Sequence, residues 1–339
     1  PPSHSPHKAF SHVIIPSLHK PIFFPHVLVS PLIQSFEQSL EQQKSTSVPV
    51  INVPSQFSLE IHSDPFLSSQ VVFSSISLSQ SLSFSSNISM MFMEHDFLDR
   101  FQAAKDAGFG AIEVQFPYDI EPKDLLAAKE SAEVEIAVIN IPAGDLTSGG
   151  PGLAAMPGRE DQFKAAVEQA HQYAEILKPV NMNVLPGWPP MDQFSREECL
   201  DVLAGNLNYA AETLAEAGVK VLVEAVNTYD RPGFLLYTSQ QAIDVIKVAD
   251  HENLAFEYDL YHMQIMEGNM VNRMIEILEH IGHIQFADTP GRHEPGTGEI
   301  NYPFVFAALD KMGWRGWLGA EYDPSGPTTE TLDWLRPFI

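Results

Sequence analysis

Four oxygen-bearing side chains stand at the ends of successive apolar segments in the second half of the chain. Glu224, Asp259, Gln285 and Glu321 each lie inside or directly after an apolar run. A charge or amide in such surroundings is costly unless it is paired or bound to a metal ion. Carboxylate and amide oxygens suit Mg²⁺ or Mn²⁺ better than zinc or copper. The four residues therefore predict a divalent metal site, with internal salt bridges or helix-capping carboxylates as the alternative.

The segments that position these residues alternate between short apolar runs and longer stretches with helical spacing. The predicted strands are 82–89, 111–116, 134–141, 180–185, 219–226, 254–259, 283–287 and 316–321. The predicted helices are 96–107, 122–132, 159–177, 196–217, 239–249, 272–281, 302–312 and 329–335. Such alternation is typical of β–α units with a parallel sheet. Eight units within residues 82–339 predict an α/β fold, the (β/α)8 TIM barrel.

A doubly wound open sheet is the alternative fold, but it would usually carry a glycine-rich nucleotide turn after its first strand. The corresponding residues 89–92 read Ser-Met-Met-Phe, which favours the barrel. In a barrel, the carboxyl ends of the strands form the active-site face. The four oxygen-bearing residues are therefore expected to meet at one mouth.

The first 81 residues differ in composition from the rest of the chain. They contain 19 serines, ten prolines, no glycine and no arginine, and their apolar patches follow no sustained period. Such a segment is expected to bury too little surface to offset its ordering entropy. We predict a Ser/Pro-rich extension over 1–81, without a fold of its own, followed by the barrel domain over 82–339. An organellar targeting role is the alternative, although transit peptides are usually arginine-rich.

Charge and cysteine content exclude several classes of protein. The chain has 19 Lys and Arg against 44 Asp and Glu, a formal net charge of −25. An acidic surface repels phosphate backbones, so no nucleic-acid partner is expected. The single cysteine, Cys199, cannot form an internal disulfide or a cysteine-based metal site. No apolar run is long enough to predict a membrane span, so we expect a cytoplasmic protein with no membrane partner.

Several motifs link residues 82–339 to a known family. The motifs are Phe-Ser-Ser-Asn-Ile-Ser-Met at 84–90, Phe-Pro-Tyr at 116–118, Pro-Ala-Gly-Asp at 142–145, Pro-Gly-Arg-Glu at 157–160, Tyr-Asp-Leu-Tyr-His-Met-Gln at 258–264, Arg-His-Glu-Pro-Gly-Thr-Gly-Glu-Ile-Asn-Tyr at 292–302 and Glu-Tyr at 321–322. Together they resemble the hydroxypyruvate isomerases of the xylose-isomerase-like barrel group. The chain departs from bacterial members in two places. Ile139-Asn140 stands where they often show His-Asn, and Asp323-Pro324 where they often show Lys-Pro.

The resemblance implies an isomerase that interconverts hydroxypyruvate and 2-hydroxy-3-oxopropanoate (tartronate semialdehyde), with a small hydroxy or oxo acid as substrate. It implies that Glu224, Asp259, Gln285 and Glu321 bind a divalent cation, Mg²⁺ or Mn²⁺. It also implies that Glu224 and Glu321 transfer protons. A homo-oligomer is left open.

Three further side chains are candidates for substrate binding. His262 follows Asp259 by three residues and could contact a substrate oxygen, although packed histidines are common at strand ends. Arg159 and Arg292 could bind a substrate carboxylate, although arginines at loop edges often form surface ion pairs. These three predictions rest on residue type and position.

Other functions are compatible with the same barrel. A 2-oxo-tetronate isomerase shares Gly-Glu-Ile-Asn-Tyr and the final Glu-Tyr, whereas ketose 3-epimerases usually carry histidine where Gln285 stands. A barrel endonuclease would need a histidine-rich multi-zinc cluster and a basic groove, and the sequence shows neither. An inactive barrel that binds a sugar acid is the non-enzymatic alternative, and the retention of all four ligand-type residues argues against it.

Overall fold

The computed structural model describes residues 13–14, 57–64, 67–75 and 82–339. The chain divides into two compact units, 1–80 and 81–339. In the first unit, the described strands are β1 (Val13–Ile14), β2 (Phe57–Asp64) and β3 (Leu67–Ser75). They pair antiparallel in the order β1-β3-β2. The sequence analysis expected no regular structure here, and the remainder of residues 1–81 lies outside the described residues.

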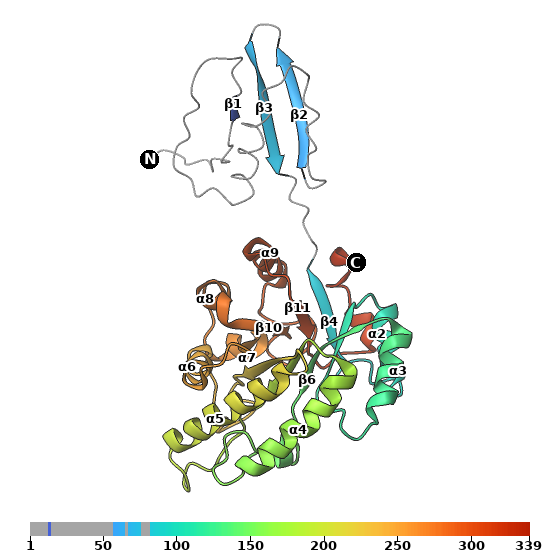
Figure 1. Cartoon of the computed structure of the whole chain (residues 1–339). Helices are drawn as coiled ribbons and strands as arrows, with labels where there is room; N and C mark the ends of the chain where they lie inside the picture. Colours follow the sequence, from blue (N-terminus) through green and yellow to red (C-terminus); the bar gives the residue numbers. More distant parts are fainter. Residues whose placement is uncertain (1–12, 15–56, 65–66, 76–81) are drawn as a thin grey trace. The chain divides into compact units, whose positions relative to one another are not determined.

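The second unit is a closed barrel of eight parallel strands, as predicted (Figure 1). Its strands are β4 (Ser83–Asn87), β5 (Ala111–Val114), β6 (Glu135–Asn140), β7 (Asn181–Val184), β8 (Lys220–Glu224), β9 (Leu254–Asp259), β10 (Ile281–Phe286) and β11 (Trp317–Ala320). Each strand pairs with its neighbours in chain order, and β11 closes the barrel against β4. The carboxyl ends of all eight strands therefore meet at one face.

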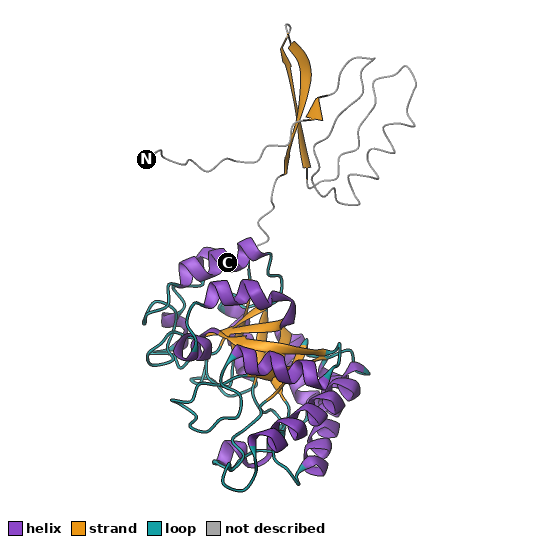
Figure 2. Cartoon of the chain, turned by 90° about the vertical axis from the view of Figure 1, so that its left-hand side faces the viewer, coloured by secondary structure: helices purple, strands orange, loops and turns teal. Residues whose placement is uncertain are grey.

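Helices surround the strands, as Figure 2 shows. The α-helices of the barrel are α2 (Asp99–Asp106), α3 (Pro122–Ala132), α4 (Glu160–Leu177), α5 (Arg196–Ala215), α6 (Ser239–Ala249), α7 (Leu260–Met266), α8 (Met270–Ile277) and α9 (Tyr302–Met312). Short 3₁₀ helices lie at η1 (Gly144–Ser148), η2 (Leu278–His280), η3 (Thr328–Thr331) and η4 (Arg336–Phe338). None of the described helices is long and apolar enough to cross a membrane.

The helix predictions need correction after β9 and after β11. The helix predicted for 272–281 is α8 followed by η2, and the additional helix α7 precedes it. The helix α7 begins directly at the strand end, where the Asp259 side chain accepts a hydrogen bond from the Tyr261 backbone N–H at 2.7 Å and caps it. The segment 329–335 forms no α-helix, because it is short and its threonines have low helix propensity.

The main core lies between the strands and the helices. Phe84 of β4 and Phe286 of β10 are buried, and both pack edge-on against Phe306 of α9 and Trp334. Edge-to-face aromatic pairs of this kind stabilise beyond their buried area. Because this packing fixes β4 and β10 against the helical layer, it also fixes the loops that follow them.

Candidate active site

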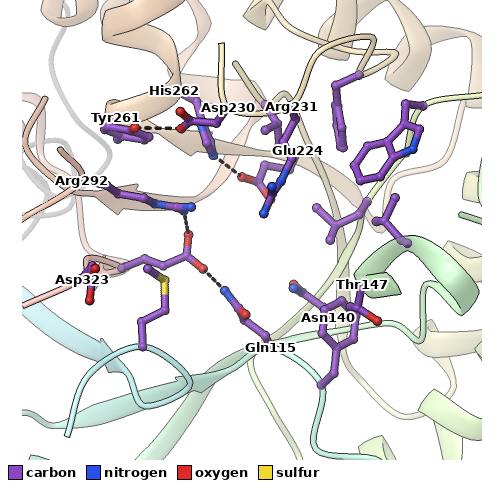
Figure 3. Close-up of a pocket in the computed structure, with 18 of the residues that line it drawn as sticks. Gln115, Asn140, Thr147, Glu224, Asp230, Arg231, Tyr261, His262, Arg292 and Asp323 are labelled. Atoms are coloured by element: carbon purple, nitrogen blue, oxygen red, sulfur yellow. Dashed lines mark hydrogen bonds and ion pairs between the residues drawn. The ribbon is translucent and has the colours of Figure 1, made fainter. Parts of the chain in front are cut away.

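A pocket of about 770 Å³ opens at the carboxyl ends of the barrel strands (Figure 3). Its lining combines acidic, basic and amide side chains with an apolar wall that includes Leu146, Trp188 and Phe234. Glu224 and Glu321 both line it, the first at the end of β8 and the second directly after β11. The barrel rule applied to the sequence therefore placed these two carboxylates correctly.

Glu224 and Asp259 lie together beside His262. The His262 Nε2 atom is 3.6 Å from Glu224 Oε1 and 3.5 Å from Asp259 Oδ2. The other oxygen of Glu224 accepts a hydrogen bond from Asn183 Nδ2 at 3.0 Å. All of these side chains are buried. One oxygen of each carboxylate is thus held by the protein, and the other faces the shared space.

Glu321 is held on three sides. Its Oε1 accepts hydrogen bonds from Asn87 Nδ2 and Gln115 Nε2, each at 2.9 Å. Its Oε2 is 2.6 Å from Arg292 Nη2, and the same nitrogen is 3.8 Å from Asp259 Oδ2. The guanidinium therefore lies between the carboxylates of Glu321 and Asp259, which connects Glu321 to the group around Glu224.

Gln285 lies beside Asp259, since β9 and β10 pair these residues in register. Its Nε2 donates a hydrogen bond to Glu113 Oε2 at 2.8 Å. Glu113 also accepts from Ser85 Oγ at 2.7 Å and lies 2.8 Å from His283 Nε2. Because the amide nitrogen of Gln285 donates to Glu113, its amide oxygen faces away from Glu113.

Two buried oxygens fit the predicted metal site. Asp259 Oδ2 and Gln285 Oε1 are buried and accept no hydrogen bond from the described part of the chain. Leaving a buried acceptor unsatisfied costs about 1–3 kcal/mol, and a hard cation would satisfy both atoms and could also bind Glu224 Oε1. Both oxygens of Glu321 already accept hydrogen bonds, so Glu321 would bind the cation through an oxygen that it shares with a protein donor. Glu224, Asp259 and His262 also offer ligand atoms within 4.8 Å of one another. The residues present therefore fit a divalent cation.

The hydrogen bonds of Asn227 favour His262 as a donor rather than a metal ligand. Asn227 Oδ1 accepts the backbone N–H groups of Tyr229 and Asp230, so its Nδ2 is the donor toward His262 Nδ1 at 2.8 Å. An Nδ1 that accepts leaves the proton of a neutral imidazole on Nε2. Burial, together with Arg292 and Arg231, lowers the pKa of His262 well below its usual value. A neutral ring with Nε2–H therefore faces the carboxylates.

Burial and crowding disfavour the ionised carboxylates when no cation balances them. Burial first, and then Glu321 and Asp259, raise the pKa of Glu224 well above its usual value. Burial raises the pKa of Asp259 to about 7, although Arg292 opposes the shift. Burial likewise raises the pKa of Glu321, again against the effect of Arg292. Like-charged carboxylates that share a buried site behave in this way, and a divalent cation would reverse the effect.

The two arginines predicted to bind substrate lie in different environments. Arg292 lines the pocket, stacks 5.3 Å from the centre of the Tyr261 ring and binds Glu321. Arg159 is not among the residues that line the pocket. Its guanidinium donates to both carboxylate oxygens of Asp145 at 2.9 Å and to the Gly152 carbonyl at 3.1 Å. The structure thus gives Arg159 a place in folding the loop around η1, and offers no geometric support for substrate contact.

Several site residues were missed from the sequence. Glu113 and Asn183 lie within buried strands. The search for a polar residue inside an apolar run, which located the candidates in the last four strands, would also have found these two residues. Glu257 of β9 is also buried, and neither of its side-chain oxygens has a hydrogen-bond partner among the described residues. Burial and then Glu224 raise its pKa well above the usual value, so its protonated form is favoured. Arg231, which lines the pocket from a loop, carried no signal in the sequence pattern.

The closed parallel barrel with a carboxylate-lined mouth defines the class of protein. Residues 101–338 match the family of xylose isomerase-like TIM barrels, and the chain belongs to this family. Among curated relatives, hydroxypyruvate isomerase of Escherichia coli K12 is 42% identical over 76% of this chain and 99% of its own length. A 2-oxo-tetronate isomerase of Cupriavidus necator is 40% identical over 76% of this chain and 98% of its own.

Among solved structures, a chain described as an AP endonuclease, family 2, from Brucella melitensis is similar in fold and sequence. It has a TM-score of 0.73 and is 37% identical over 76% of this chain and 99% of its own. A D-psicose 3-epimerase from Clostridium cellulolyticum, at 19% identity and a TM-score of 0.60, shares the fold. The relatives thus span the barrel, and about three quarters of this chain accounts for nearly all of their length.

Proposed function

We propose that this protein is an isomerase that interconverts hydroxypyruvate and 2-hydroxy-3-oxopropanoate by proton transfer through an enediolate. The observation that carries the proposal is the placement of two buried carboxylates, Glu224 and Glu321, in the lining of one pocket. The reaction moves a carbonyl between adjacent carbons, and it needs one group to remove a proton and one to deliver a proton. The names of the similar relatives point to the same substrate class.

In the forward direction, one glutamate removes a proton from C3 of hydroxypyruvate. The C3–H electron pair forms the C2–C3 double bond while the π pair of the C2 carbonyl moves to its oxygen, which gives the enediolate. Delivery of a proton to C2, together with transfer of the C3 hydroxyl proton to the C2 oxygen, breaks the C2–C3 double bond and completes the aldehyde product. Glu224 and Glu321 both line the pocket, so either carboxylate can exchange a proton with a bound substrate. His262 Nε2–H is placed to donate to a substrate oxygen, and the apolar wall at Trp188 and Phe234 would limit water around the enediolate.

The proposal includes a divalent cation, Mg²⁺ or Mn²⁺, held by Glu224, Asp259, Gln285 and Glu321. When bound, such a cation holds substrate oxygens and stabilises the negative charge that develops on them. The unsatisfied oxygens of Asp259 and Gln285 support this ligand set. We place the protein in the cytoplasm and in glyoxylate metabolism as part of the same proposal.

A 2-oxo-tetronate isomerase is the second candidate, favoured by the Cupriavidus relative at nearly the same identity. An endonuclease has less support, because the described residues contain one group of His, Cys, Asp and Glu fit to hold a metal, with a single histidine. The net charge of −25 also opposes a nucleic-acid substrate. Ketose 3-epimerases share the barrel fold, but they usually carry histidine where this chain has Gln285.

The experiment is a direct comparison of substrates. The purified chain is assayed with hydroxypyruvate and with 2-oxo-tetronates, each after EDTA treatment and after addition of Mg²⁺ or Mn²⁺. We expect kcat/KM for hydroxypyruvate to exceed that for the tetronates by at least about tenfold, which corresponds to about 1.4 kcal/mol. EDTA is expected to abolish turnover. A reversed preference would assign the tetronate reaction, and inactivity on every oxo acid would refute the proposal.

A further inference from the structure

The pocket is acidic, yet the proposed substrate is an anion. Its lining contains the carboxylates of Glu224, Asp230, Glu321 and Asp323 and two arginines, Arg231 and Arg292. A carboxylate that enters such a pocket is repelled unless a cation is free to bind it. Binding of the substrate carboxylate therefore requires that Arg231 or Arg292 has hydrogen-bond donors that the protein does not already use.

The charge of Arg292 is already used by the protein. Its Nη2 is 2.6 Å from Glu321 Oε2 and 3.8 Å from Asp259 Oδ2, and its guanidinium stacks on Tyr261. Two anionic neighbours raise its pKa further, against the effect of burial. A substrate carboxylate at Arg292 would have to compete with Glu321, which is itself needed for proton transfer in the proposed mechanism.

Arg231 has a fixed backbone and a free side chain. Its backbone N–H donates to the Asn227 carbonyl at 3.2 Å, and its own carbonyl accepts from the Phe234 N–H at 3.1 Å. The side chain is exposed and lies in the pocket beside Glu224 (Figure 3). Among the pocket residues drawn in Figure 3, none is joined to its guanidinium by a hydrogen bond or ion pair.

The positive charge of Arg231 also reaches the reacting groups. Its side chain lies beside Glu224, whose Oε1 is 3.6 Å from His262 Nε2 (Figure 3). A carboxylate bound at Arg231 would therefore lie at the end of the pocket next to the proton-transferring groups. The turn of residues 227–230 keeps Arg231 near these groups. In this turn, Asn227 Oδ1 accepts two backbone N–H groups and Asn227 Nδ2 donates to the Asp230 carboxylate at 2.9 Å.

We propose that Arg231 binds the carboxylate of the substrate and thereby selects oxo acids over neutral ketoses. The inference rests on the proposed function, since it assumes an anionic substrate. A guanidinium presents a planar pair of donors that matches a carboxylate and forms two parallel hydrogen bonds. A neutral ketose has no group that needs this cation.

The test replaces Arg231 and compares matched ligands. Arg231→Gln removes the charge, Arg231→Lys keeps it without the fork, and Arg336→Gln is the control. Arg336 is an exposed arginine that pairs with Asp333 at 2.8 Å and does not line the pocket. The binding probes are D-glycerate and glycerol, which differ by a carboxylate in place of a hydroxymethyl group and are not substrates of the proposed reaction.

For Arg231→Gln we expect the KM for hydroxypyruvate to rise at least about tenfold, with a smaller change in kcat, because ground-state binding is lost. The preference for D-glycerate over glycerol, measured by calorimetry, should shrink by a similar factor. Arg231→Lys should recover part of both, and Arg336→Gln should match the wild type. An unchanged KM and an unchanged preference in Arg231→Gln would overturn the inference. A wild-type protein inactive on all oxo acids would instead overturn the proposed function.

Discussion

Glu224, Asp259 and Glu321 are buried at the barrel mouth. Glu224 and Asp259 each use one oxygen for the protein and leave the other for the site, whereas the second oxygen of Glu321 is bound by Arg292. Glu224 is bound by Asn183, Asp259 caps α7, and Glu321 accepts from Asn87 and Gln115. This division explains how carboxylates can be fixed in position and still bind a cation. The sequence analysis gave helix-capping carboxylates as an alternative to a metal site, and one oxygen of Asp259 does cap a helix. The other oxygen of Asp259 has no hydrogen-bond partner among the described residues.

The first prediction concerns proton transfer. In Glu321→Gln the side chain keeps its size but cannot exchange a proton near neutral pH, and its amide nitrogen cannot accept the hydrogen bond that one carboxylate oxygen accepts. We expect turnover of hydroxypyruvate to fall by at least about a hundredfold, the lower end of what positioned acid–base groups supply. Metal occupancy must be confirmed, because Glu321 is also a proposed ligand. Near-normal turnover in the metal-loaded variant would remove Glu321 from this role.

The second prediction concerns pH. The pKa of Asp259 is raised to about 7 by burial, above its usual value of 3.8. A raised native pKa gives stability that is fully present below the unfolded pKa and is lost as pH rises through the native pKa. The metal-free fold should therefore lose stability between about pH 4 and pH 7, and a cation that binds the ionised form should restore it.

The measurement is the difference in melting temperature between Mg²⁺-loaded and EDTA-treated protein at pH 5 and pH 8. We expect a larger difference at pH 8. Titrating groups away from the site contribute equally to both preparations and cancel in the difference. A difference that is equal at the two pH values would show that these carboxylates do not bind the cation.

How far the site could be predicted depends on where each side chain lies. Glu224, Asp259, Gln285 and Glu321 follow the strands of the barrel, so strand periodicity and the barrel rule located them. His262 follows from the same rule, because α7 starts at the strand end. Arg231 lies on an irregular loop, and Arg159 is turned to Asp145, so neither side chain's position follows from a periodic pattern.

At the scale of elements, β4, β5 and β10 share a polar layer beside the proposed metal site. Glu113 of β5 accepts hydrogen bonds from Ser85 and Gln285 and pairs with His283. Burial raises the pKa of Glu113, but His283 and the two hydrogen bonds more than offset this and hold it below its usual value. An ionised Glu113 fixes the amide of Gln285 with its nitrogen inward. In this way one strand orients the proposed ligand of another.

The third prediction uses the glycine opposite Glu113. A Cβ at Gly319 of β11 would lie 2.0 Å from Glu113 Oε1, so Gly319→Ala must displace the carboxylate. We expect a loss of about 1–3 kcal/mol in the free energy of unfolding, the usual cost of overpacking, and weaker binding of Mn²⁺ by titration. Gly205→Ala in α5, where a Cβ would meet no atom within 4 Å, is the control and should be neutral or stabilising. Unchanged Mn²⁺ affinity in Gly319→Ala would contradict the role given to Glu113.

The sequence predicted the barrel strands well because buried parallel strands read as short apolar runs. The starts and ends of helices were harder to predict. Helix α7 begins without a loop after β9, and the sequence pattern predicts no helix over its few residues. The segment after β11 contains apolar residues at helical spacing, but its threonines favour the 3₁₀ turns of η3.

For the whole molecule, the barrel unit accounts for the family match and the pocket. The N-terminal strands β2 and β3 show what the sequence analysis overlooked, since Phe57, Leu59 and Ile61 alternate with polar residues in the pattern typical of a strand. The many serines and prolines around them give the segment a composition typical of chains without a fold. That residues 1–81 have no fold of their own stays a prediction.

The fourth prediction is that residues 1–81 are dispensable for the barrel. The similar relatives match about three quarters of this chain over nearly their whole length, and Leu82 is the first residue of the buried core of the barrel. A protein of residues 82–339 should therefore keep the melting temperature and turnover of the full chain. A large loss of either would show that the extension contributes to the barrel.

The most direct test of the account is the origin of the hydrogen at C2 of the product. In the proposed route, the proton leaves C3 to a carboxylate such as Glu224 or Glu321, where it can exchange with solvent before a proton is delivered to C2. Turnover of hydroxypyruvate in deuterated water, followed by NMR or mass spectrometry, should therefore yield product with deuterium at C2. Product free of deuterium at C2 across a range of temperatures and turnover rates would contradict proton transfer and indicate direct hydride transfer between the carbons.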